Sequence, residues 1–158
     1  MKTIFTFLGI ALLALWLADC TSAQKSATVK TAPAEDPIAA DRAKFIRQLR
    51  VKIAGQENTP ADSVFQNIQR LNGVTAGRLL NIMDIWGSVL GVSCDHCHAT
   101  YAWASEIKPE KEIARQMMDL TIQLNENLKK IEALEGTQPS VSCYTCHRGS
   151  TRPETKPK

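Results

Sequence analysis

CDHCH at residues 94–98 and CYTCH at residues 143–147 are two copies of the pattern C-x-x-C-H. This pattern is the attachment signature of a c-type haem. Two thiols at this spacing can form thioethers with both vinyl groups of one porphyrin, and the adjacent imidazole can ligate the iron. The two copies use four of the five cysteines in the 158-residue chain. We therefore expect two covalently attached haem c groups.

The pattern assigns a role to six residues. The expected haem-attachment residues are Cys94, Cys97, Cys143 and Cys146, and the expected proximal iron ligands are His98 and His147. A four-thiolate zinc site is one alternative, but residues 98–142 separate the two pairs, against ~15–20 residues in typical sites. Two structural disulfides are the other alternative. Neither explains a histidine directly after both pairs, so haem attachment is favoured.

Residues 1–23 have the features of an export signal. A lysine precedes an apolar run over residues 4–18, and small residues follow it. The run is shorter than the ~20 residues that a membrane-spanning helix needs. Two cleavage positions stay open. Cleavage after Ala23 would remove Cys20, whereas cleavage before Cys20 would leave this residue as a lipid-anchored N-terminus. We expect an exported, periplasmic protein, either soluble or lipid-anchored.

The remaining chain divides by composition into three parts. Residues 24–40 are rich in Ala, Thr, Lys and Pro, which is typical of a flexible linker. Residues 41–152 form the predicted dihaem domain, and residues 153–158 form a polar tail. A domain of this size has a thin apolar core of its own. Because two haems would enlarge that core, we expect the apoprotein to fold poorly.

Apolar residues in the domain recur with helical periodicity, without an alternating strand pattern. We predict an all-α fold, that of a small multihaem cytochrome c. Helices are predicted over residues 41–54, 61–71 and 75–90, and from Pro109 along an apolar stripe that ends at Ile131. The last two each precede a CxxCH motif. The sequence therefore predicts a repeated unit of helix, turn and motif.

The sixth iron ligands are less clear from the residues. The chain has three histidines, and only His96 is not in a proximal position, so at least one haem cannot have two histidine ligands within a monomer. Met83 and Met117 each lie in the apolar stripe of the helix before a motif. Met118 is rotated by ~100° from that stripe and is the weaker candidate. Spacing alone leaves Met83 and Met117 as either iron ligands or packing residues.

Several stretches outside the motifs carry a family resemblance. They are VFQNIQ at 64–69 followed by Leu71, residues 75–86, ASE at 104–106 with Lys108, ARQM at 114–117, Asn125, and VSCYTCHRG at 141–149. Together they resemble the haem-binding repeat of the photosynthetic reaction-centre cytochrome c subunit family. The resemblance covers about residues 62–152. In that family a methionine on the helix before the motif is the sixth ligand, which implies Met83 for the first haem and Met117 for the second.

The resemblance also has limits that are informative. Four-haem members of that family contain two two-haem halves, so it implies a single half here. Residues 129–142 lack the histidine that ligates the fourth haem in those proteins. Arg115 and Arg148 lie close to the predicted ligands in sequence, and each is either a partner of haem propionates or an ordinary solvated arginine.

These observations predict an exported dihaem cytochrome that relays electrons between redox partners, with both irons His/Met-ligated and no catalytic residues. The alternative is a small haem enzyme (a peroxidase or nitrogen-oxide reductase) or a haem sensor with one open iron, but His96 is its only spare imidazole. The net charge of +3 permits docking on an acidic partner or an anionic membrane. A membrane redox complex or reaction centre is a candidate partner. We expect no nucleic-acid partner, and membrane attachment only through a lipid at Cys20.

Overall fold

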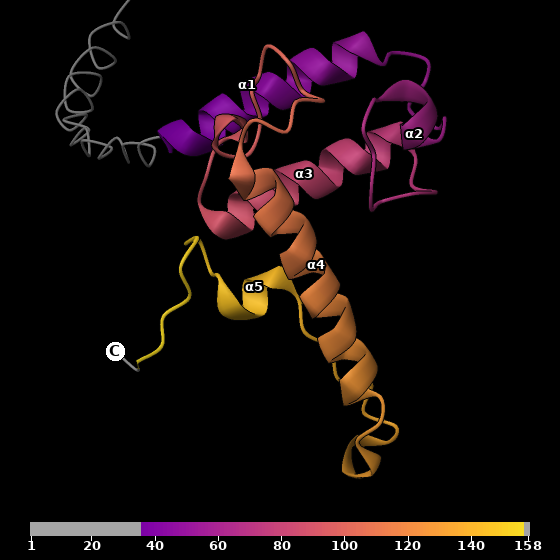
Figure 1. The fold of residues 1–158 in the computed structure, drawn as a ribbon, viewed down its shortest axis with the longest axis vertical. Coiled ribbons are helices and arrows are strands. Elements are labelled where there is room, and N and C mark those ends of the chain that lie inside the picture. The colour runs from indigo at the N-terminus through magenta and orange to yellow at the C-terminus, as the bar shows by residue number, and fades with distance from the viewer. Residues whose placement is uncertain (1–35, 157–158) are drawn as a thin grey trace, which may run out of the picture. The chain divides into compact units, whose positions relative to one another are not determined.

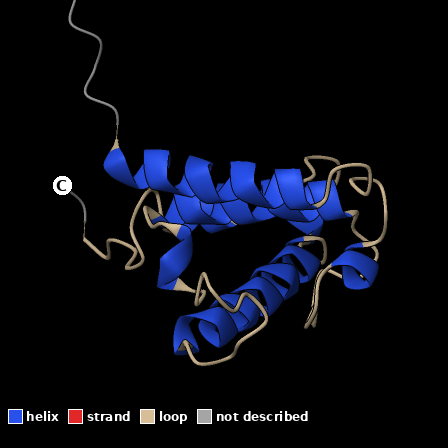
Figure 2. Ribbon diagram, turned by 90° about the horizontal axis from the view of Figure 1, so that it is seen from above, coloured by secondary structure: helices blue, strands red, loops and turns tan. Residues whose placement is uncertain are grey.

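The computed structural model describes residues 36–156. The predicted export signal and residues 24–35 of the predicted linker lie outside the described residues. The described elements are α1 (Pro37–Lys52), α2 (Ala61–Val64), α3 (Ala76–Leu90), η1 (Cys94–His96), α4 (Pro109–Leu128), η2 (Glu132–Leu134) and α5 (Cys143–Cys146). All of them are helical (Figures 1 and 2), which confirms the all-α prediction. None of the described helices is both long and apolar enough to cross a membrane.

Helices α1 and α3 lie side by side and supply the core (Figures 1 and 2). Ile46 and Ile53 from the α1 side are buried against Ala76 and Leu80 of α3. Between the two helices, Arg42 Nε donates to Asp84 Oδ1 at 2.7 Å. Helix α1 begins four residues earlier than predicted. The reason is local: a proline occupies its first position, where no N–H partner is needed, and the side chain of Asp36 accepts from the next N–H.

The predicted helix over residues 61–71 is wrong beyond its first turn. Helix α2 ends at Val64, and Phe65 has extended backbone. Asn67 has φ +63°, which a helix cannot contain, and asparagine tolerates this region better than most residues. Its side-chain N–H donates to the carbonyl of Ala104 at 2.7 Å. This long-range hydrogen bond replaces local helical bonding, so residues 65–71 run as an irregular segment.

Helix α3 agrees with its prediction at both ends. The hydroxyl of Thr75 accepts from the N–H of Arg78, and Gly91 ends the helix with φ +66°. Gly91 has a second role that is tertiary. The N–H of Gly149 donates to Val89 O at 2.6 Å, and a Cβ on Gly91 would overlap the carbonyl of Gly149. The chain just after the second motif therefore contacts the end of α3 just before the first motif.

Helix α4 begins at Pro109 as predicted and has Glu110 and Glu112 in its first turn, where the helix dipole favours them. It ends at Leu128 rather than at Ile131, and η2 follows. Figure 1 shows α4 running away from the α1–α3 pair. Only residues 91–93 separate α3 from the first motif, which begins at the start of η1, whereas residues 129–142 separate α4 from the second motif. Because the two connections differ, the repeated unit stays a prediction.

Candidate functional site

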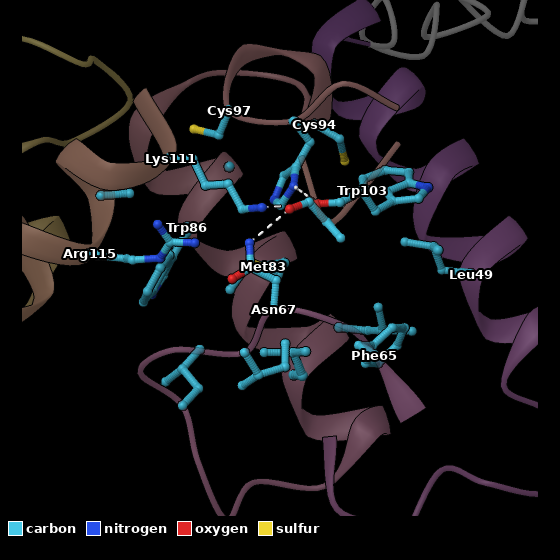
Figure 3. Close-up of a pocket in the computed structure, with 18 of the residues that line it drawn as sticks. Leu49, Phe65, Asn67, Met83, Trp86, Cys94, Cys97, Trp103, Lys111 and Arg115 are labelled. Carbon is cyan, nitrogen blue, oxygen red and sulfur yellow. Dashed lines mark hydrogen bonds between the residues drawn. The ribbon is translucent and has the colours of Figure 1, made fainter. Parts of the chain in front are cut away.

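A cavity of about 570 Å³ lies beside the first motif. Its lining includes Met83 of α3 together with Cys94, Cys97 and His98 (Figure 3). These are the four residues predicted for the first haem. Met83 lies before the end of α3, and the motif follows that end. The fold places the side chains of all four residues around the same cavity. The volume lies in the range of ~300–1,000 Å³ that is typical of pockets for small molecules and cofactors.

The walls of this cavity are mainly apolar side chains from three parts of the chain. They are Ile46 and Leu49 of α1, Val64, Phe65, Ile68 and Leu71 around the end of α2, and Leu79, Leu80, Trp86 and Leu90 of α3. The irregular segment over residues 65–71 thus forms one wall. Its apolar residues, which suggested a helix by their spacing, contribute to the lining of the cavity.

The backbone orients the imidazole of His98. Its Nδ1 lies 3.3 Å from the carbonyl oxygen of Trp103, and the two rings have centroids 5.3 Å apart. A carbonyl only accepts, so Nδ1 must carry the proton in this contact, which leaves Nε2 with its lone pair free. Burial lowers the pKa of His98 and so favours the neutral imidazole. A neutral ring with Nδ1–H bonded to a carbonyl is the usual state of a metal-ligating histidine.

The thiols of the first motif are protonated at neutral pH. Burial, with a smaller contribution from Asp41, raises the pKa of Cys94 to about 11, and burial also raises that of Cys97. The four described cysteines are free thiols. No group of three or more potential metal-binding side chains of the His, Cys, Asp or Glu type gathers within residues 36–156.

The second motif shows the same local arrangement. Helix α5 contains Cys143 and Cys146, and Ser142 and Thr145 form a capping box at its start. His147 follows the helix, and its Nδ1 lies 2.9 Å from the carbonyl oxygen of Ser150. As at the first motif, Nδ1 must donate to this carbonyl. Both predicted proximal histidines therefore use Nδ1 as the donor to a backbone carbonyl.

Asn125 connects α4 to the segment before the second motif. Its side-chain oxygen accepts from Val141 N at 2.8 Å, and its side-chain N–H donates to Val141 O at 2.9 Å. Four apolar side chains on one face of the same helix are exposed: Ile113, Met117, Leu120 and Leu124. Met117, the predicted second methionine ligand, is 39 % exposed within this stripe. The structure thus holds Val141, two positions before the second motif, against α4 and does not enclose Met117.

Arg115 differs from one of the two roles that the sequence left open, that of an ordinary solvated arginine. It is 8 % exposed, lines the cavity, and donates to Glu106 at 2.6 Å and to Glu112 at 2.9 Å. Its hydrogen bonds lower the pKa of Glu106 to about 2. Arg115 is thus a buried, ion-paired residue and not a solvated one. Arg148 is exposed and has φ +46°.

His96 has no place in the cavity. It lines a separate, open pocket with residues that include Ile38, Lys108 and Glu110. His96 is therefore not among the side chains of the first motif that line the cavity.

Several residues of the site could not be found from the sequence. Trp103 and Ser150 act through their backbone carbonyls, which every residue possesses, so their identity carries no signal. Asn67 contributes through hydrogen bonds to residues 104 and 106, far along the chain. Glu106 and Lys111 pair with each other because of how the loop before α4 folds. The only sequence signal against a helix at this point was Asn67 itself, because asparagine adopts positive φ more readily than most residues.

Comparison with known proteins adds the following findings. Residues 23–156 match the family model described as photosynthetic reaction centre cytochrome C subunit. The chain is 34 % identical over 97 residues to the photosynthetic reaction center cytochrome c subunit of Thermochromatium tepidum, covering 60 % of this chain and 23 % of that protein. It is 29 % identical over 104 residues to the subunit of the same name from Rubrivivax gelatinosus, covering 65 % and 27 %.

A third similar protein has a different name. Cytochrome c-554 of Chloroflexus aurantiacus is 33 % identical over 86 residues, covering 53 % of this chain and 20 % of that protein. The matches thus span about a quarter of the length of the curated relatives.

Proposed function

Because this chain belongs to the photosynthetic reaction-centre cytochrome c subunit family, we propose that it is an electron carrier with two covalently attached haem c groups. The observation that carries this proposal is the cavity that gathers Met83, Cys94, Cys97 and His98. When bound, each haem supplies a one-electron Fe(III)/Fe(II) couple. The chain itself would attach the haems, ligate the irons and exclude water.

The residues of the first site fit a porphyrin. The cavity is apolar on its walls, as the face of the macrocycle requires, and two free thiols stand beside it. His98 presents an unprotonated Nε2, and the thioether of Met83 is a soft, neutral ligand that raises the potential relative to a second histidine. Cys94 and Cys97 would form the thioethers, His98 the proximal bond, and Met83 the sixth bond.

The second site has the same types of residue but is more open. Cys143 and Cys146 would attach the second haem, and His147, oriented by Ser150 O, would be its proximal ligand. The exposed apolar stripe around Met117 on α4 is a surface that a porphyrin face would cover. This stripe, and the two hydrogen bonds by which Asn125 of α4 holds Val141 just before the motif, support Met117 as the sixth ligand.

The partner and the location are also part of the proposal. The names of two relatives place those proteins in photosynthetic reaction centres. A membrane redox complex of that kind is the partner class that we propose for this chain, which carries a net charge of +3 before any propionates. We further propose that the chain is exported to the periplasm, with Cys20 either removed with the signal or lipidated.

The test is an optical spectrum of the matured protein. A pyridine haemochrome assay against protein concentration should give two haems per chain. The reduced spectrum should not change with carbon monoxide, because methionine would fill both sixth positions. One haem per chain would contradict the dihaem proposal. Rapid carbon monoxide binding would instead reveal an open iron, as in a haem enzyme or sensor.

A further inference from the structure

The carbonyl oxygen of Trp103 receives two donors. One is Nδ1 of His98 at 3.3 Å, and the other is the ammonium group of Lys111 at 3.1 Å (Figure 3). The corresponding contact of His147 to Ser150 is shorter, 2.9 Å. Among the hydrogen bonds of the described residues, none brings a lysine or arginine to Ser150 O. The two predicted proximal histidines therefore differ in one respect: a lysine donates to the same carbonyl as His98, and no such donor accompanies His147 among the described residues.

Lys111 is fixed in this position. Its side chain is 11 % exposed, and its ammonium also donates to Ser105 O at 3.0 Å and pairs with Glu106 at 3.1 Å. It lines the same cavity as His98. A cation with so little exposure is weakly screened by solvent, so its field acts on the cavity.

We propose that Lys111 is a positioning residue that raises the reduction potential of the haem ligated by His98, and leaves the second haem unaffected. This inference rests on the proposed function. Reduction here adds one electron to Fe(III) and gives Fe(II), with no proton transferred and no bond formed or broken. A residue raises the potential if it disfavours the ferric state relative to the ferrous state.

Two effects of Lys111 have this sign. First, the ferric site carries one more positive charge than the ferrous site, and a nearby ammonium repels it. Second, a proximal histidine becomes more basic when its Nδ1–H bonds a strong acceptor. Lys111 also donates to the carbonyl oxygen of Trp103, and this second hydrogen bond makes the oxygen a weaker acceptor for His98. The imidazole then donates less charge to the iron, and the ferric state loses stabilisation.

The experiment uses the haem-loaded protein and three substitutions at one position. Lys111→Met removes both charge and donor, Lys111→Gln removes the charge and keeps a donor, and Lys111→Arg keeps both. Lys129→Met is the matched control. Lys129 directly follows α4, its side chain is 67 % exposed, and it pairs with Glu126. Each protein is titrated spectroelectrochemically with small-molecule mediators, and its thermal unfolding is followed by circular dichroism to establish that it folds.

Lys111→Met and Lys111→Gln should lower one of the two midpoint potentials, with roughly a tenfold change in the ferrous/ferric ratio, which corresponds to 59 mV for one electron. The other potential, and both potentials in Lys111→Arg and Lys129→Met, should match the wild type. An unchanged Lys111→Met overturns the proposal. So does an equal shift at both haems, whereas a lowered potential in Lys111→Met with a wild-type-like Lys111→Gln would support it through donation to the Trp103 carbonyl alone. Failure of the proposed function would be visible earlier, as a wild-type protein without two haems.

Discussion

The contact between Gly91 and Gly149 can be tested by adding one methyl group. Gly91→Ala places a Cβ against the backbone carbonyl of Gly149, which cannot rotate away as a side chain would. To relieve the overlap, the segment after the second motif must move from α3. That movement breaks the hydrogen bond from Gly149 N to Val89 O. The contact between the two motif regions should therefore weaken.

The expected loss has three parts. Alanine at φ +66° costs about 1 kcal/mol relative to glycine. The lost hydrogen bond contributes about 1 kcal/mol, and residual overlap about 1 kcal/mol more. We expect Gly91→Ala to lower the free energy of unfolding by about 3 kcal/mol. Gly136→Ala is the matched control, since Gly136 has φ +80° and nothing within 4 Å of an added Cβ. It should lose about 1 kcal/mol.

Urea unfolding of the haem-loaded variants, followed by far-ultraviolet circular dichroism, measures these losses. The informative quantity is the difference of about 2 kcal/mol between the two variants, because the cost of the backbone conformation is common to both. Equal losses for Gly91→Ala and Gly136→Ala would refute the reasoning. They would mean that the chain after the second motif does not depend on its contact with α3.

Three further predictions concern single side chains. Met83→Ala should convert one haem to a high-spin, carbon-monoxide-binding form with a lower potential, whereas an unchanged spectrum and potential would make Met83 a packing residue only. Asn125→Ala should increase amide hydrogen exchange over residues 135–142 and lower stability by about 1–3 kcal/mol, because it leaves polar groups of Val141 unpaired; an exchange pattern like the wild type would count against this role. Glu106 has a pKa lowered to about 2 from an ordinary 4.5, so the stability that it contributes is present above pH 4.5 and is lost as the pH falls through 2. In urea unfolding at pH 7, 4 and 2, Glu106→Gln should be less stable than the wild type at pH 7 and similar to it at pH 2, and a gap that persists at pH 2 would contradict the ion-pair explanation.

The first site shows how far residue patterns reach. CxxCH spacing predicted Cys94, Cys97 and His98. The apolar stripe of a helix left Met83 open as ligand or packing residue, and the family resemblance implied it as a ligand. All four residues line one cavity. The wall over residues 65–71 was predicted as helix, because its apolar spacing fits one. Spacing could not show that Asn67 would bond to Ala104 instead, since that partner lies 37 positions away.

Arg115 illustrates the same limit for charge. The sequence shows an arginine near a predicted ligand and several acidic residues nearby. Its burial and its pairing with Glu106 depend on how the loop after the first motif returns to α4. Only the folded chain brings these two groups within 2.6 Å of each other.

The sequence by itself determined the features that depend on neighbouring residues: the two thiol pairs with their histidines, the caps of α3 at Thr75 and Gly91, and the start of α4 at Pro109. These follow from local spacing and local backbone hydrogen bonding, which a short segment contains completely. The tertiary structure alone decided the contact of Gly149 with α3, the carbonyls that orient His98 and His147, and the position of Lys111 on Trp103. The contact of Gly149 with α3 joins backbone groups 60 positions apart. The carbonyls of Trp103 and Ser150 lie only five and three positions from their histidines, but every residue has a carbonyl, so the path of the loop decides which one is the acceptor.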